Sequence, residues 1–185
     1  MHQKPAVIDW LYILLLSAFW GSAFVFIKIA SPVVGATGLV FMRLILASVL
    51  LGFLFIRKRH LKTIRKNIFP ILMIGATNVA LPFYLFAYSA FEINANTMAV
   101  MNGSTPLFAF LFSVILLKFK FQWPQLLGIL IGLLGLAIVV GFESMQFELL
   151  PIFAAMMGAA MYGFSMSYIY QIKILDTKVM AAVTM

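Results

Sequence analysis

Six long apolar runs are the feature that most constrains how this chain folds. Each is close to the roughly 20 residues that an α-helix needs to cross the hydrocarbon core of a bilayer. Backbone groups cannot stay unpaired in lipid, so a spanning run of this kind is predicted to be a helix. The six runs are Trp10–Ala30, Val33–Ile56, Ile68–Phe91, Ala95–Leu117, Trp123–Phe142 and Leu149–Tyr170. The sequence therefore predicts an all-α fold, a polytopic membrane helix bundle.

The composition agrees with a chain whose solvent is the lipid bilayer. Hydrophobic residues make up 64% of the 185 residues and charged residues only 10%, a balance that a soluble domain does not need. The first run is too long for a secretory signal and Asp9 interrupts the expected basic flank, so we predict a permanent helix there. The chain contains no cysteine, which excludes disulfide and thiolate chemistry.

The positions of the charges predict an orientation. The formal net charge is +8, which by itself is compatible with a nucleic-acid partner. However, the basic residues gather in the loops on one side, above all in the run 57–66, whereas Glu92, Glu143 and Glu148 fall on the other side. Because positive loops stay in the cytoplasm, we expect a cytoplasmic N-terminus, a cell (inner or plasma) membrane location and no nucleic acid.

Several polar side chains are predicted to meet at the centre of the bilayer. At about 1.5 Å per residue, Arg43 lies roughly 15 Å from the start of its run, close to the midplane. The same count brings polar side chains of the first, third and fourth runs to this level. The resulting candidates for a substrate cavity are Trp20, Ser22, Arg43, Asn78 and Asn102.

Arg43 carries the strongest expectation among them. A charge at the centre of a membrane helix costs about 2.5–3.5 kcal/mol on insertion scales, so Arg43 is expected to face the interior. It either binds an anionic group of a substrate or is a structural donor to helix carbonyls and Asn side chains. The amides and the Ser22 hydroxyl also serve as ordinary interhelical bonds in membrane bundles. Lys28, near the outer interface, either extends its side chain to water or lines an outer gate.

Proline and glycine residues mark two further features. Pro82 and Pro106 each remove a backbone hydrogen bond from a predicted helix, which predicts a kink; such a kink either opens a pocket or serves packing. In the fifth run, Gly128, Gly132 and Gly135 recur on one face and give a smooth stripe for close helix packing. The partner of this stripe is either another helix of the chain or a second copy of the chain.

Several chemistries are absent from the sequence. There is no His-Glu-x-x-His motif and no glycine-rich phosphate loop, and His2 and His60 lie outside the runs. No Asp or Glu lies in the middle of a run, so the usual carboxylate proton relay is missing. We therefore expect no metal, no cofactor and no enzymatic activity.

The sixth run resembles the first. "SAFWGSAFVFIK" from Ser17 aligns with "AAMYGFSMSYIY" from Ala159, which places Trp20 over Tyr162 and Gly21 over Gly163. An odd number of spans separates the two copies, so the second begins on the opposite side of the membrane. Inverted repeats of this kind build secondary transporters with a binding site near the midplane.

The chain also resembles a known family, the EamA-type members of the drug/metabolite transporter superfamily. The resemblance rests on "FWGSAFVFIK", "FMRLILAS", "FYLFAYSAFEINANTMAVMNGSTPLFAFLFSVILL" and "QLLGILIGLLGLAIVVG". It implies ten helices in two inverted five-helix repeats that carry amino acids, other metabolites or toxic organic compounds through a central cavity.

The resemblance divides the chain in two. Residues 1–142 correspond to the first five-helix repeat, and residues 143–185 to an incomplete second repeat with one full helix and a stub that begins near Val179. Two full repeats would need about 290 residues, so we expect a fragment or a truncated reading frame, lacking its second repeat or pairing as a homodimer.

Two functions follow from this reading of the sequence. The first is a permease or exporter of a small-molecule substrate, which works by alternating access around the midplane cavity. The second is a non-transporting membrane subunit or an inactive transporter fragment, whose polar midplane serves only packing.

Overall fold

The helical spans predicted from the sequence are present in the structure. The computed structural model describes residues 7–56, 58–172 and 184, and within these ranges it contains helices and no strand. Six helical stretches are long and apolar enough to cross a membrane: Ile8–Val34, Ala36–Phe55, Ile68–Ser89, Ala95–Leu116, Trp123–Val140 and Leu149–Ile172. The predicted all-α polytopic bundle is therefore confirmed, while the stub from Val179 lies outside the described residues except for Thr184.

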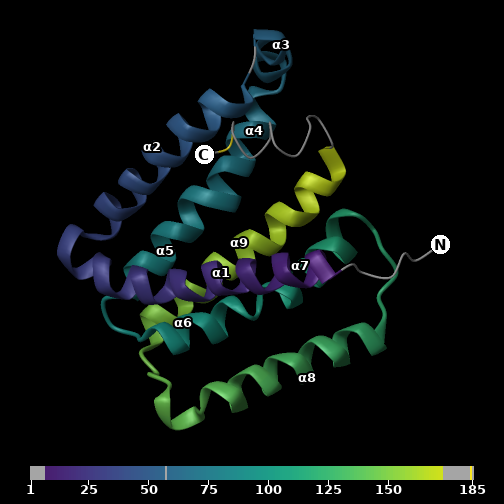
Figure 1. Ribbon diagram of the computed structural model, residues 1–185. Helices are drawn as coiled ribbons and strands as arrows, with labels where there is room; N and C mark the ends of the chain where they lie inside the picture. Colours follow the sequence, from purple (N-terminus) through teal and green to yellow (C-terminus); the bar gives the residue numbers. More distant parts are fainter. Residues whose placement is uncertain (1–6, 57, 173–183, 185) are drawn as a thin grey trace.

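The six spans are divided into shorter elements (Figure 1). The first two spans are α1 and α2, and the third and fourth are each interrupted. The elements are α1 (Val7–Val34), α2 (Ala36–Phe55), α3 (Lys58–Lys66), α4 (Ile68–Gly75), the π-helix η1 (Ala76–Ala80), α5 (Leu81–Ser89), α6 (Ala95–Asn102), α7 (Thr105–Leu116), α8 (Trp123–Val140), the 3₁₀-helix η2 (Phe142–Ser144) and α9 (Leu149–Ile172).

Glycine residues set two helix ends that the sequence analysis placed elsewhere. Helix α1 continues past Pro32, and the following Gly35 adopts a φ of 75°. Helix α8 ends before Gly141, whose φ is 84°. Both values lie in the left-handed region that favours glycine, so the chain turns at these glycines rather than at the proline.

The two ends of the bundle differ in charge and in packing. We call the end with Gly35, Ala90–Asn94 and Gly141–Glu148 the acidic end, and the end with Ile56, Lys58–Asn67 and Leu117–Gln122 the basic end. In Figure 1 the helices converge at the acidic end, on the left, and spread apart toward the basic end. The basic loop 57–66, for which no helix was predicted, contains the short helix α3.

The hydrophobic core lies in the half of the bundle near the acidic end. Its buried members are Ile27, Ala36, Phe86, Ala87, Ala90, Ile93, Met98 and Ala155. They come from α1, α2, α5, α6 and α9 and from the segment between α5 and α6. Helix α9 has the largest buried share among the six spans, because it packs against α4, η1, α5, α6 and α7.

Hydrogen bonds between elements also concentrate at the acidic end. Asn94 caps α6 by accepting from the Thr97 N–H at 2.8 Å, and its amide donates to the Ser144 carbonyl at 2.6 Å. The Gln146 N–H donates to the Thr97 hydroxyl at 3.0 Å. Ser89 donates to the Pro151 carbonyl at 2.8 Å, which ties α5 to α9.

Lys28 takes part in the same network. Its Nζ donates to the carbonyl of Ala90 at 2.8 Å, and Ala90 is the C-cap residue of α5. A cation at a helix C-terminus satisfies a free carbonyl and interacts favourably with the helix dipole. The Lys28 ammonium is thus held at the acidic end by a contact within the bundle, which neither sequence expectation included.

Candidate functional site

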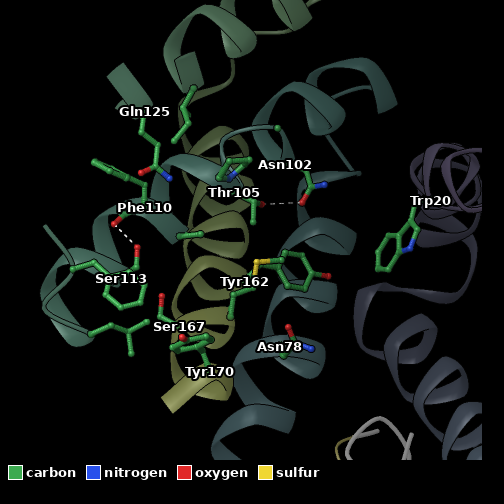
Figure 2. A pocket seen from close by; sticks show the side chains of 17 residues that line it. Trp20, Asn78, Asn102, Thr105, Phe110, Ser113, Gln125, Tyr162, Ser167 and Tyr170 are labelled. Atoms are coloured by element: carbon green, nitrogen blue, oxygen red, sulfur yellow. Dashed lines mark hydrogen bonds between the residues drawn. The ribbon is translucent and has the colours of Figure 1, made fainter. Parts of the chain in front are cut away.

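A cavity of about 1000 Å³ runs from the middle of the bundle toward the basic end. Its walls come mainly from η1, α6, α7, α8 and α9, with Trp20 contributed by α1. Figure 2 shows Tyr162 near its centre, between Asn102 and Asn78, with Trp20 facing it from the side. The lining residues are Trp20, Asn78, Asn102, Gly103, Thr105, Pro106, Ala109, Phe110, Ser113, Leu117, Phe119, Gln125, Ile129, Tyr162, Met166, Ser167 and Tyr170.

The π-helix η1 brings Asn78 to the cavity. The N–H of Leu81 donates to the carbonyl of Ala76, five residues earlier, as a π-helix requires. Pro82 follows directly and has no N–H, so the carbonyl of Asn78 cannot receive the usual bond from the residue four positions later. Asn78 thus belongs to the widened turn, and its side chain lines the cavity.

The break between α6 and α7 positions Asn102. Helix α6 ends at Asn102 and α7 begins at Thr105, with Pro106 in its first turn. The Thr105 hydroxyl donates to the Asn102 side-chain oxygen at 3.5 Å, the dashed line beside these residues in Figure 2. Ser104 donates to the Met101 carbonyl at 2.5 Å. Side chains of the break thus satisfy backbone and amide groups beside the cavity.

Close packing of α7 on α9 fixes the position of Tyr162. A methyl group added at Gly163 would lie 2.6 Å from the backbone nitrogen of Ala109 and 2.7 Å from the carbonyl carbon of Phe108. Only a residue without a side chain permits this approach. The Tyr162 ring stacks with Phe86, with 6.3 Å between ring centroids.

Arg43 occupies a second, much smaller cavity of about 20 Å³. The guanidinium carbon of Arg43 lies 4.0 Å from the centre of the Phe83 ring, a cation–π contact. The small cavity shares the side chains of Trp20, Asn102 and Tyr162 with the large one. These three side chains therefore lie where the two cavities adjoin.

The five cavity candidates from the sequence differ in the cavity that they line. Trp20, Asn78 and Asn102 line the large cavity, and Arg43 lines the small one beside it. Ser22 lines neither of them: its hydroxyl donates to the Phe19 carbonyl of its own helix at 3.1 Å.

Tyr162 is one of several cavity residues that were not among the candidates predicted from the sequence. It lines both cavities, and its place in the repeat alignment opposite Trp20 was the available signal. In the structure these two aligned aromatic residues, from α1 and α9, lie in the same wall.

The glycine stripe of α8 has open space beside it among the described residues. A methyl group added at Gly128, Gly132 or Gly135 would meet no atom within 4 Å apart from its own helix and chain neighbours. The packing partner predicted for this stripe is therefore not found among the described helices, and the close packing of the stripe stays a prediction.

The part of the chain that the structure describes holds no group of three or more His, Cys, Asp or Glu side chains suited to a metal ion. The polar groups in the walls of the large cavity are amides, hydroxyls and the indole of Trp20. Such groups form hydrogen bonds with a polar or amphipathic molecule.

These features define an integral membrane protein with a cavity at the centre of its helix bundle. Comparison with family models identifies it further: the model of the EamA-like transporter family matches residues 8–141. The chain belongs to the EamA-like transporter family, which confirms the resemblance seen in the sequence.

The comparison with curated proteins gives a distant relative. The chain is 22% identical over 130 residues to an "Uncharacterized transporter" from Archaeoglobus fulgidus. The alignment covers 70% of this chain and 46% of that relative, so the chain spans less than half the length of the protein it matches. No solved structure shows significant similarity to the chain.

Proposed function

We propose that the chain takes part in carrying a small metabolite, such as an amino acid or another organic compound, across a cell membrane by alternating access. The observation that carries this proposal is the cavity of about 1000 Å³ in the middle of the helix bundle. Its volume is at the upper end of the range of small-molecule sites. Membership of a transporter family supports the same function.

The different packing of the two ends supports a state that is open on one side. The core and the hydrogen bonds from Lys28, Ser89 and Asn94 close the acidic end. The cavity continues toward the basic end along Leu117 and Phe119. With basic loops in the cytoplasm, the N-terminus is cytoplasmic and this state faces inward.

Uptake into proteoliposomes tests the proposal. The full chain, purified from membranes and shown to be folded by a cooperative thermal transition, is reconstituted and supplied with radiolabelled amino acids, organic acids and organic amines. We expect saturable uptake of at least one class above that of protein-free liposomes, because a specific cavity has a limited number of sites. Uptake that rises linearly with concentration, or equals that of empty liposomes for every compound, would contradict the proposal.

A further inference from the structure

Arg43 is the charged residue at the level of the cavity. Within the described spans the other charged side chains lie near helix ends: Asp9 in the first turn of α1 and Lys28 at the acidic end. The remaining acidic residues of the described chain are in segments outside the spans. No carboxylate of the described residues therefore neutralises Arg43 at the bilayer centre.

The hydrogen-bonding capacity of Arg43 is also unused within the described residues. A guanidinium has five N–H donors, and its contact with the Phe83 ring uses the positive charge rather than these donors. The structure contains no hydrogen bond from Arg43 to another described residue. Arg43 is half-buried, and a charge in the middle of a membrane helix is costly without a partner, so this side chain suits an acceptor that carries negative charge.

The two adjoining cavities differ in the part of a ligand that each can hold. The small cavity around Arg43 offers about 20 Å³, close to the space that one water molecule needs, so it admits about one oxygen atom of a compact group. The large cavity is lined beyond Asn102 by Phe110, Phe119 and Tyr170. It therefore suits an apolar or aromatic body.

The approach to the large cavity carries positive charge as well. A neighbouring cavity of about 420 Å³ at the basic end shares Phe110 and Phe119 with the large one and is lined by Lys120. Lysine at the mouth of a low-dielectric cavity raises the local concentration of anions. No acidic side chain lines either of these cavities, so an ammonium group has no carboxylate partner in the described walls.

We propose that the site selects amphipathic monocarboxylates, with the carboxylate paired to Arg43 and the apolar body in the large cavity. Arginine suits this role because its guanidinium stays charged and donates a charge-assisted hydrogen bond to a carboxylate oxygen. Trp20, Asn102 and Tyr162 lie where the two parts of such a ligand join. The proposal rests on the proposed function in so far as the large cavity is the substrate site.

Three ligands that share the phenylpropanoyl skeleton test the proposal by equilibrium binding. Isothermal titration calorimetry of the full chain in detergent compares 3-phenylpropanoate, 3-phenylpropanamide and phenylalanine at pH 7.5. We expect the carboxylate to bind at least tenfold more tightly than the neutral amide, since a charge-assisted hydrogen bond replaces a neutral one. We also expect it to bind more tightly than phenylalanine, whose ammonium group stays unpaired.

Variants of Arg43 and Lys28 assign this preference to a residue. Arg43→Gln removes the charge and is expected to bring the affinity ratio of carboxylate to amide close to one. Arg43→Lys keeps the charge and should retain a preference for the carboxylate, weaker than in the unchanged chain. Lys28→Gln is the matched control, because Lys28 donates to Ala90 and lines neither cavity, so its ratio should be unchanged.

Binding measurements on the chain without substitutions are enough to overturn the proposal. Equal affinity for carboxylate and amide, tighter binding of phenylalanine, or no binding of 3-phenylpropanoate would each do so, even if Arg43→Gln fails to fold. A ratio that persists in folded Arg43→Gln would overturn the role of Arg43. Binding is separate from transport: carboxylate binding without uptake contradicts the proposed function, whereas saturable uptake without carboxylate binding contradicts the substrate class.

Discussion

Replacing Gly163 by alanine is expected to destabilise the bundle by about 3 kcal/mol, near the upper end of what overpacking costs. The added methyl group would lie within 2.7 Å of backbone atoms of Phe108 and Ala109. Backbone atoms of a packed helix cannot move aside as a side-chain tip can, so α7 and α9 must separate. This separation removes packing between two helices of the bundle. We therefore expect a large fall in the yield of folded protein and in the thermal transition temperature.

Gly21→Ala is the matched control for this substitution. Gly21 aligns with Gly163 in the repeat, but a methyl group added there meets no atom within 4 Å other than its own helix and chain neighbours. Alanine favours a helix over glycine by about 1 kcal/mol, so Gly21→Ala should be neutral or slightly stabilising. Equal thermal transition temperatures for the two variants would show that α7 and α9 do not pack as described.

Filling the cavity is expected to stop transport without unfolding the protein. Ser113 lines the large cavity toward the basic end, and its hydroxyl donates to the Phe110 carbonyl at 2.9 Å. In Ser113→Trp, an indole enters space that is open in the structure, so the helices do not have to separate. We expect uptake into proteoliposomes to fall at least tenfold, about 1.4 kcal/mol or more in barrier height, while the thermal transition temperature changes little.

Leu134→Trp provides the comparison for the cavity-filling variant. Leu134 is 60% exposed on α8, and it is not among the residues that line the cavities. This variant carries the same added side chain and should retain full uptake. Normal uptake by folded Ser113→Trp would remove the large cavity from the transport path.

The spans could be predicted from the sequence because lipid leaves few alternatives for a long apolar run. The helix ends were harder to predict. The predicted first run ends at Ala30, before Pro32, yet the helix continues through this proline and the chain turns at Gly35 with its φ of 75°. The π-helix Ala76–Ala80 could not be predicted from the hydropathy of the sequence. Hydropathy does not change when a helical turn contains one additional residue.

Counting residues predicted the level of each candidate residue along its helix. It could not predict the side of the helix on which the side chain lies. Counting residues places Trp20 and Ser22 at the same level of the bilayer, but successive residues are about 100° apart around a helix. In the structure Trp20 lines both cavities, and Ser22 bonds to its own helix. The same count could not reveal that Tyr162 lines both cavities, because this depends on the packing of α9 at Gly163.

The most direct test of the central claim uses the thiol of a single introduced cysteine. The chain contains no cysteine, so Asn102→Cys places one reactive group in the wall of the large cavity, and Leu134→Cys gives a lipid-facing control.

Membrane-impermeant maleimide is added from either side of oriented vesicles, with and without a transported compound. Alternating access predicts that the thiol of the Asn102→Cys variant reacts from both sides and that the transported compound slows its reaction, while the thiol of the Leu134→Cys variant does not react. Failure of the Asn102→Cys thiol to react from either side, or a rate that no transported compound changes, would contradict the account.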